Sequence, residues 1–391
     1  MNLNLTNVVL LLAGAQGFFL TIILTHRYRK LYANRFLAAM IALFSLVLLY
    51  LFAYEIGYLG KHPHLIQFFL GFCLLLPPLH YLYAYFLIHR GRRFQKTDWL
   101  HYLPFGIYQI FWIVYRVLVS NEYAPLAQQN KAESLSTAAL LYNWIIILIS
   151  AVYISKTLLM LHSYSRRLQS YFSSIEKIRL SWLRNTTLLL ILFLLVFIVE
   201  NVFYLFGINL SNFFTLSSTL IAVYVYSLGY MGLIKSEILS NPATVESITQ
   251  LSIDDSVDNG ESEKVARYRK SGLTPEKLQE SHQALLKLME SERLYQTSDL
   301  TLAQLAERLQ ISSHNLSEVL NTQAGKNFFD FINHYRVEQV KIDLLDPAKR
   351  GYKLIALAFD AGFNSKSSFN TIFKKYTGMT PSQFRDSKLQ R

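Results

Sequence analysis

The sequence predicts an all-α protein with a bundle of seven apolar helices followed by a soluble helical region. Its 391 residues are 52% hydrophobic and only 16% charged, and the mean hydropathy is +0.24. The long apolar runs nearly all precede Lys235, whereas the C-terminal region carries two helix-turn-helix patterns in tandem. Soluble chains of this length rarely have such a composition, so we expect the first part to lie in a membrane.

Seven apolar stretches are long enough, or nearly so, to cross about 30 Å of hydrocarbon as helices that rise about 1.5 Å per residue. They occupy residues 8–25, 36–58, 64–88, 99–119, 138–161, 187–206 and 212–234. We therefore expect residues 1–238 to form a seven-helix transmembrane domain.

Basic residues concentrate in alternate loops between these stretches. One set of loops holds Arg27, Arg29, Lys30, Arg35, Arg90, Arg92, Arg93, Lys96, Arg166, Arg167, Lys177, Arg179 and Arg184. The other set holds only Lys61 and Lys131, with Arg116 at a helix end. Because Lys and Arg are enriched in cytoplasmic loops, we expect the N-terminus outside and the chain from Lys235 onward in the cytoplasm.

Ionisable residues inside the apolar stretches are few and costly to bury in lipid, which makes each a candidate site. Glu55, Arg116 and Glu200 all fall in the outer third of their helices. They either line an outward-facing sensor pocket or serve as interfacial or ion-paired residues. No spacing typical of metal ligands occurs, and the single cysteine, Cys73, excludes an internal disulfide and a cysteine-based zinc site. We expect neither a metal nor a cofactor.

Two connecting segments differ in character from the apolar stretches. Residues 165–184 place apolar side chains at helical spacing among basic ones, which predicts an amphipathic helix. That helix either lies on the lipid headgroups or contacts the C-terminal region. Residues 239–280 are turn-prone and acidic, with Asp254, Asp255 and Asp258 close together, and predict a flexible linker.

The first helix-turn-helix pattern begins at Leu302. Leu302, Leu305 and Ala306 form the predicted buried face of a short helix, and residues 310–312 form the turn. A second helix is expected from Ser313, with Ser312 as its N-cap.

The second pattern repeats this design after a long amphipathic helix at residues 328–345. Leu357 and Ala358 belong to its short helix, and Gly362 suits a turn in which φ is positive. Ser365 suits the N-cap of its second helix. A single such pattern is weak evidence, but two joined by a long helix are far more specific.

These residues resemble the AraC family of bacterial transcription regulators over roughly residues 281–389. The resemblance is strongest at residues 355–358 (IALA), 362–363 (GF), 367–369 (SSF), 373–375 (FKK) and 378–385 (GMTPSQFR). The whole chain also looks like the membrane-anchored members, which carry a seven-helix sensor in front. The resemblance implies that residues 281–391 bind double-stranded promoter DNA, with each second helix in one of two successive major grooves.

On positions that match the family, the resemblance supplies two sets of DNA-contacting candidates. The candidates for reading bases are His314, Ser317, Glu318, Lys366, Ser367, Asn370 and Thr371. The candidates for binding phosphates are Ser365, Lys374, Lys375 and Arg385. Asn can bind adenine through two hydrogen bonds, and Lys can donate to guanine. Family members often carry a basic residue where Glu318 stands, so the first unit here is less basic than usual.

The sequence therefore predicts a membrane-bound one-component transcription regulator in the bacterial inner membrane. In this interpretation the bundle senses an unidentified ligand or membrane partner, and the C-terminal domain acts in the cytoplasm, with a homodimer as one mode of action. The alternative is a membrane transporter or channel with a regulatory tail. The sequence has no glycine-rich nucleotide loop and no catalytic constellation, so we do not expect an enzyme.

Overall fold

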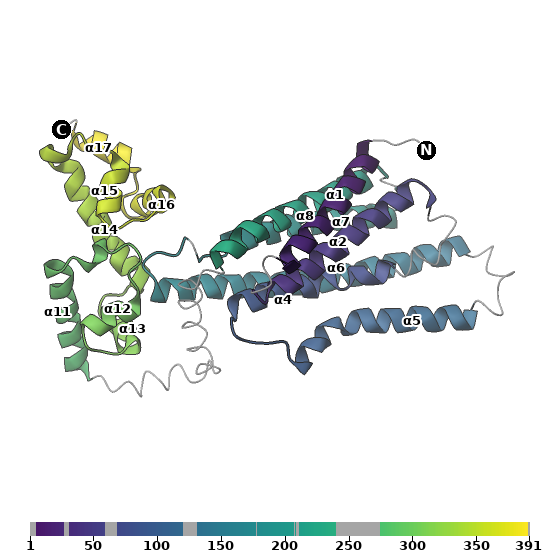
Figure 1. Cartoon of the computed structure of the whole chain (residues 1–391), viewed down its shortest axis with the longest axis horizontal. Helices are drawn as coiled ribbons and strands as arrows, with labels where there is room; N and C mark the ends of the chain where they lie inside the picture. Colours follow the sequence, from purple (N-terminus) through teal and green to yellow (C-terminus); the bar gives the residue numbers. More distant parts are fainter. Residues whose placement is uncertain are drawn as a thin grey trace. The chain divides into compact units, whose positions relative to one another are not determined.

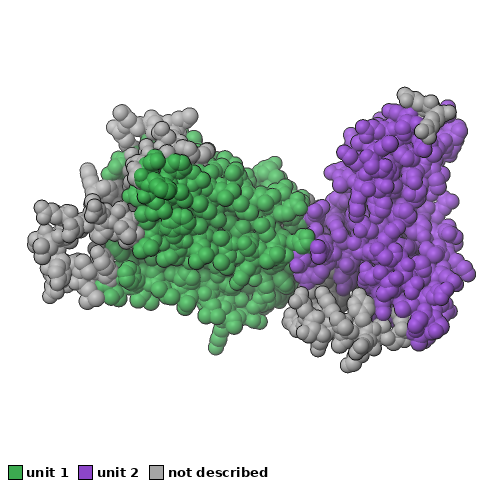
Figure 2. Space-filling view, turned by 180° about the vertical axis from the view of Figure 1, so that it is seen from behind, with its two compact units in different colours: residues 1–162, 180–252 green, residues 163–179, 253–391 purple. Residues whose placement is uncertain are grey.

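The computed structural model describes residues 5–26, 31–58, 69–119, 131–176, 178–206, 208, 211–239 and 274–389. Within these ranges the secondary structure is helical, apart from one isolated antiparallel β-bridge between Phe172 and Thr301. The chain divides into two compact units, coloured separately in Figure 2. Unit 1 comprises residues 1–162 and 180–252, and unit 2 comprises residues 163–179 and 253–391.

Unit 1 is built from helices that overlap the predicted spans to different extents, and one of them, α6, continues into unit 2 (Figure 1). They are α1 (Leu5–His26), α2 (Asn34–Glu55), α4 (Leu76–Ile88), η2 (Lys96–Tyr102), α5 (Leu103–Val119), α6 (Lys131–Tyr171), α7 (Ser181–Leu205) and α8 (Ser211–Leu239).

Five helical segments of the described residues are long and apolar enough to cross a membrane. These are Asn7–His26, Asn34–Ala53, Phe69–Ile88, Leu140–Tyr171 and Ser181–Leu205. A sixth segment, Thr219–Lys235, is apolar but shorter, and α5 has 17 residues. A membrane domain of exactly seven spans accordingly stays a prediction.

Small residues allow the helices of unit 1 to approach closely. A Cβ atom added to Gly17 of α1 would lie 1.9 Å from Ser45 Oγ of α2. On α8, a Cβ atom on Gly229 or Gly232 would lie 2.5 Å from the side chain of Leu20 or Leu37. Helices packed through small residues in this way are common in membrane proteins, where van der Waals contact drives association.

The third apolar segment is interrupted by a turn just before its proline pair. Helical residues 69–73 are followed by a turn at Leu74-Leu75, and α4 then begins with Pro77 and Pro78 in its first turn. Leu74 N–H and Leu75 N–H donate to carbonyls three residues earlier, at 3.1 and 3.0 Å. Proline lacks the N–H that would continue the regular helical ladder, which accounts for the break.

The connection between α6 and α7 does not form the amphipathic helix that its sequence predicts. Instead α6 continues to Tyr171, residues 172–176 and 178–180 are not helical, and α7 starts at Ser181. Phe172 N–H still donates to Leu168 O at 3.0 Å, but Ser173 N–H donates to Leu300 O at 3.1 Å and Phe172 forms a bridge with Thr301, so the helical hydrogen bonding stops here. The expected contact with the C-terminal region is therefore present, in a non-helical form.

The rest of unit 2 is a set of short helices around one long one. They are α11 (Pro275–Ser291), η4 (Leu294–Gln296), α12 (Leu302–Arg308), α13 (Ser313–Thr322), α14 (Phe328–Leu345), η5 (Pro347–Lys349), α15 (Leu354–Asp360), α16 (Lys366–Thr377) and α17 (Pro381–Leu389). In Figure 1, α14 runs between the group of α11, α12 and α13 and the group of α15, α16 and α17.

The predicted linker, residues 239–280, falls mostly outside the described residues. Helix α11 starts at Pro275, inside the predicted linker, and is capped by Thr274, whose hydroxyl accepts from Lys277 N–H. Leu285 and Met289 of α11 are fully buried in the core of the first helix-turn-helix unit. The folded C-terminal region therefore begins several residues before the predicted boundary.

Candidate DNA-binding surface

The two helix-turn-helix units close their turns in the same way. In the first, Ile311 N–H donates to Ala306 O at 3.1 Å; in the second, Phe363 N–H donates to Ala358 O at 3.0 Å. At the equivalent turn position Gln310 has φ 56° and Gly362 has φ 97°. The second helix of each unit then starts at a serine N-cap, as predicted from the sequence.

Those caps have explicit hydrogen bonds. The Ser312 hydroxyl accepts from Asn315 N–H at 3.1 Å, and the Ser365 hydroxyl accepts from Ser368 N–H at 3.1 Å. A serine at this position satisfies one of the backbone N–H groups that a helix start leaves unpaired. The start of α13 and of α16, and hence the side chains each helix presents, is thus fixed by local chemistry.

Gly362 is required at its turn for a second reason. A Cβ atom there would lie 2.4 Å from Tyr295 O and 2.9 Å from the backbone of Gln296. The second unit thus packs its turn directly against the backbone of Tyr295 and Gln296 in η4.

Each second helix has a buried face and an exposed face. Leu316, Val319 and Leu320 of α13 are at most 1% exposed, and Phe369 and Phe373 of α16 are equally buried. The predicted inward faces are therefore correct, and the opposite faces are available to a partner.

The exposed face of α16 carries the predicted base-reading residues of the second unit. Lys366, Ser367, Asn370 and Thr371 are all exposed. Their positions repeat at intervals of four along the helix, so they share one face. Lys374 continues that face by one further turn.

An open hollow lies between α16 and the start of α17. Its lining side chains are polar or basic, apart from Pro381: Asn370, Thr371, Lys374, Lys375, Thr380, Pro381 and Ser382. Thr380 and Gln383 cap α17 reciprocally, since each side chain accepts from the other's backbone N–H. A helix start presents partial positive charge, which adds to that of the lysines and favours a phosphate.

The predicted phosphate contacts differ in how freely they are available. Lys375 Nζ forms an ion pair with Asp330 Oδ1 of α14 at 2.7 Å. Arg385 is half-buried and lies 3.5 Å from Asp386 Oδ1. Ser365 is half-buried, and its hydroxyl already caps α16. Lys374 is exposed and lies on the same face as Asn370.

In the first unit the candidates separate. His314 is exposed and Ser317 is half-buried, whereas Glu318 is only 6% exposed. The structure therefore does not expose Glu318 with the other base-reading candidates. Position 318 is two residues from both Leu316 and Leu320 and so does not share their face of the helix, which means that its burial comes from packing by other parts of unit 2.

The sequence reasoning missed a buried polar cluster around Arg336 of α14. Arg336 is 1% exposed, and its Nε donates to Tyr295 O at 2.7 Å. Its Nη2 donates to Thr297 O at 2.8 Å and to Ser298 O at 3.2 Å. Burial lowers the pKa of Arg336 to about 10, so the guanidinium stays charged at neutral pH and needs these acceptors. The signal in the sequence that could have indicated this cluster is a basic residue within the apolar face of the helix at residues 331–340.

Of the three candidate sensor residues in unit 1, the structure describes the side chain of Glu200 alone. Those of Glu55 and Arg116 lie outside the described side chains. Glu200 lines a cavity of about 630 Å³ within unit 1, together with Asn143 and His80. His80 is 2% exposed and bonds to Thr187 Oγ1 at 3.0 Å and Tyr224 OH at 2.9 Å, as a structural histidine does.

Comparison with known proteins places the C-terminal region in a class. Residues 305–387 match a family model described as a helix-turn-helix domain. An uncharacterised HTH-type transcriptional regulator of Staphylococcus aureus (strain COL) is 33% identical over 90 residues, which are 23% of this chain and 12% of that protein. The transcriptional regulatory protein HptR of S. aureus is 32% identical over 90 residues, covering 34% of its length. The chain thus spans only a minor part of the curated relatives it matches.

Two solved structures also match part of the chain. The C-terminal domain of the two-component response regulator yesN from Fusobacterium nucleatum subsp. nucleatum is 32% identical. The match covers 27% of this chain and 98% of that one, with a TM-score of 0.25. A protein of unknown function from Listeria innocua is 27% identical, with 27% and 93% covered and a TM-score of 0.24.

The C-terminal region is an AraC-type helix-turn-helix domain, and the relatives that share it are transcription regulators. These findings support a DNA-binding regulator.

Proposed function

We propose that this protein is a membrane-bound one-component transcription regulator. Its apolar helices hold it in the bacterial inner membrane, and its C-terminal unit binds promoter DNA in the cytoplasm. The observation that carries the DNA-binding half is the shared exposed face of α16, where Lys366, Ser367, Asn370 and Thr371 are free of the core and Lys374 extends the row.

The side chains on that face of α16 have two different roles, which follow from their chemistry. Side chains that form two hydrogen bonds to a base edge discriminate sequence, and cations that contact phosphates fix register. Asn370 suits the first task and Lys374 the second. By family membership, this is a binding function and not an enzymatic one.

The membrane half is supported by the five long apolar segments and by the distribution of basic loops. We propose a multi-pass arrangement with the N-terminus outside. This topology puts unit 2 in the cytoplasm, where bacterial DNA is accessible. The transporter or channel alternative is not favoured, because the relatives of the C-terminal region are transcription regulators.

We further propose that the cavity of unit 1 receives the signal. It is mostly lined by apolar side chains, with Glu200 and Asn143 among the few polar ones. A pocket of this kind selects an apolar ligand that carries one polar group. Filling it with Ile146→Trp would make the regulator unresponsive to any such ligand, whereas Leu148→Trp, at an exposed position of the same helix, would not.

Two measurements test the proposal as a whole. The full chain in lipid nanodiscs is expected to enrich specific duplexes from a random-sequence library, with affinity that falls steeply as salt rises. A reporter fused after residue 391 is expected to be active on the cytoplasmic side. Absence of enrichment at low salt, or a C-terminus on the outer side, would refute it.

A further inference from the structure

The connection between α6 and α7 contributes a short segment to the helix-turn-helix domain. We call residues 172–176 the strap. Phe172 forms the antiparallel bridge with Thr301, and Ser173 N–H donates to Leu300 O at 3.1 Å. The Ser173 hydroxyl also donates to Leu300 O, at 2.7 Å. The strap is thereby paired with the residues that lead directly into α12 of the first unit.

The same segment reaches α14. Arg336 Nη1 donates to Ser173 O at 3.2 Å, and Arg336 Nη2 donates to Ser173 Oγ at 3.1 Å. Asn333 Nδ2 donates to Ser173 O at 3.1 Å. Both Arg336 and Asn333 are buried, so the strap supplies acceptors that water does not reach. A buried guanidinium that loses its acceptors destabilises the folded state. Undocking of the strap would therefore destabilise α14.

The strap also bonds to the second helix-turn-helix unit. Asn364, one residue before the Ser365 cap of α16, donates through Nδ2 to Ser174 Oγ at 2.6 Å and to Asp299 Oδ1 at 3.1 Å. Residues 173 and 174 therefore join the approach to α12, the long helix α14 and the start of α16.

The strap leaves the proposed DNA-binding face open. With it in place, His314, Lys366, Ser367, Asn370 and Thr371 are still exposed. A segment that blocked DNA sterically would cover these side chains. Its effect on DNA binding must instead come from the arrangement of the two units that it holds.

The strap is joined to a helix of the apolar domain without a break. Helix α6 runs from Lys131 to Tyr171, and its segment Leu140–Tyr171 is one of the five long apolar ones. Ser173 follows two residues after the end of that helix. The end of α6, from Ser163 to Tyr171, belongs to unit 2 together with the strap, so a change in this end of α6 would act on Ser173 through two residues of chain.

Resting on the proposed function, we propose that the strap is the regulatory contact of this protein: docked on α14, it holds both helix-turn-helix units in the arrangement that binds DNA, and movement of α6 withdraws it. Signals then pass through α6 and not through the linker at residues 239–273. Docking and DNA binding stabilise each other, so each strengthens the other by the same factor.

Ser173→Lys tests this in the full chain, because it places a second cation against the buried Arg336. The substitution leaves the sequence of residues 274–391 unchanged. The matched control is Ser163→Lys, the same substitution at an exposed position of α6 in the same unit. The probe is a duplex that the wild-type chain in nanodiscs selects from random-sequence DNA. We expect Ser173→Lys to weaken binding by about tenfold, within the usual range of coupling between sites, and Ser163→Lys to leave it unchanged.

Hydrogen exchange supplies the second readout. Wild-type protein should protect the Ser173 amide, and Ser173→Lys should lose that protection while the amides of α14 stay protected. Full protection in the variant would overturn the docking contact. Lost protection with unchanged DNA affinity would overturn the regulatory link and leave the proposed function standing, whereas a wild-type chain that selects no duplex would refute the proposed function itself.

If Ser173→Lys also exposes the amides of α14, Ser174→Ala decides the matter. It removes the hydroxyl that accepts from Asn364 and donates to Glu176 Oε2, and it keeps every acceptor of Arg336. It should reduce affinity for the selected duplex less than tenfold but measurably, with the fold intact. An affinity equal to that of wild type would overturn the strap's role in positioning α16.

Discussion

Arg336 and Ser173, 163 residues apart in the chain, share two hydrogen bonds in the interior of unit 2. The guanidinium donates to both the carbonyl and the hydroxyl of the serine, and its remaining donors reach carbonyls near η4. A planar group with five donors can serve this many acceptors at once, which a lysine ammonium with three donors cannot.

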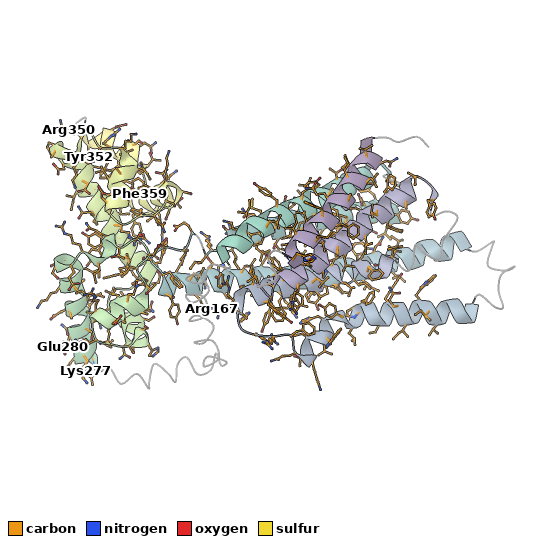
Figure 3. All side chains as sticks on the ribbon, in the orientation of Figure 1. Arg167, Lys277, Glu280, Arg350, Tyr352 and Phe359 are labelled. Carbon is orange, nitrogen blue, oxygen red and sulfur yellow. The ribbon has the colours of Figure 1, made fainter. Side chains whose placement is uncertain are left out.

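The first prediction concerns that geometry. Arg336→Lys keeps the charge but leaves several buried carbonyls unpaired, so the free energy of unfolding of unit 2 should fall by about 2–4 kcal/mol. Arg350→Lys, at an exposed position labelled in Figure 3, should change it by less than about 0.5 kcal/mol. Denaturant unfolding of the full chain, followed by hydrogen exchange at α14, measures both. Equal stability of the two variants would contradict the role given to Arg336.

A second prediction separates backbone strain from steric overlap at glycine. Gly362→Ala combines a positive φ with a close contact to Tyr295 O, so it should destabilise unit 2 by more than the roughly 1–3 kcal/mol typical of strained backbone alone. Gly378→Ala has φ 75° and open space, and should show strain only. Gly351→Ala has neither and should be nearly neutral.

Melting temperatures of these three variants should therefore fall in the order Gly351→Ala, Gly378→Ala, Gly362→Ala, from highest to lowest. A Gly362 variant as stable as the Gly351 variant would show that the turn does not pack on η4 as described.

A third prediction distinguishes sequence reading from phosphate contact on α16. Asn370→Ala should relax the preferred base at one position of the selected duplex, at a cost of about 1–3 kcal/mol for the preferred sequence. Lys374→Ala should weaken binding to all sequences alike and lower the salt slope by about 1. Lys287→Ala removes the same charge from an exposed site on α11 and should do neither. Identical effects of Lys374→Ala and Lys287→Ala would exclude a phosphate contact at Lys374.

A fourth prediction follows from the burial of Glu318. Glu318→Gln should leave the selected sequence unchanged, because a side chain that is 6% exposed does not reach a base edge. His314→Ala, at an exposed position on the same helix, should alter the preference at a base of the first half-site. Parallel selections with the two variants measure this. A changed consensus of the DNA selected by Glu318→Gln would show that Glu318 contacts a base, and would contradict this prediction.

Local chemistry explains how much of unit 2 was predictable. The caps at Ser312 and Ser365, the turn at Gly362 and the small residues Ala306 and Ala358 are dictated by backbone geometry within a few residues. The sequence therefore predicted both helix-turn-helix units and most of the exposed face of α16.

The strap was not predictable in the same way. Its apolar residues recur at helical spacing, so periodicity alone favours a helix, but pairing with Leu300 and Thr301 overrides that preference. The acceptors that Arg336 needs come from a segment far away in sequence, and no local pattern encodes such a contact. The burial of Glu318 was not predictable for a related reason: the family resemblance implied a base-reading role at this position, and the packing that leaves the side chain 6% exposed is not encoded in a local pattern.

The central claim is that a protein held in the membrane reads chromosomal DNA through α13 and α16. Cross-linking cells that express the full chain, isolating the membrane fraction and sequencing the DNA bound to the protein tests it most directly. The account predicts that a small set of promoter regions is recovered from the membrane fraction, and that Asn370→Ala loses or redistributes them. Recovery of no region above background by the wild-type chain, or the same regions with the same occupancy for Asn370→Ala, would contradict it.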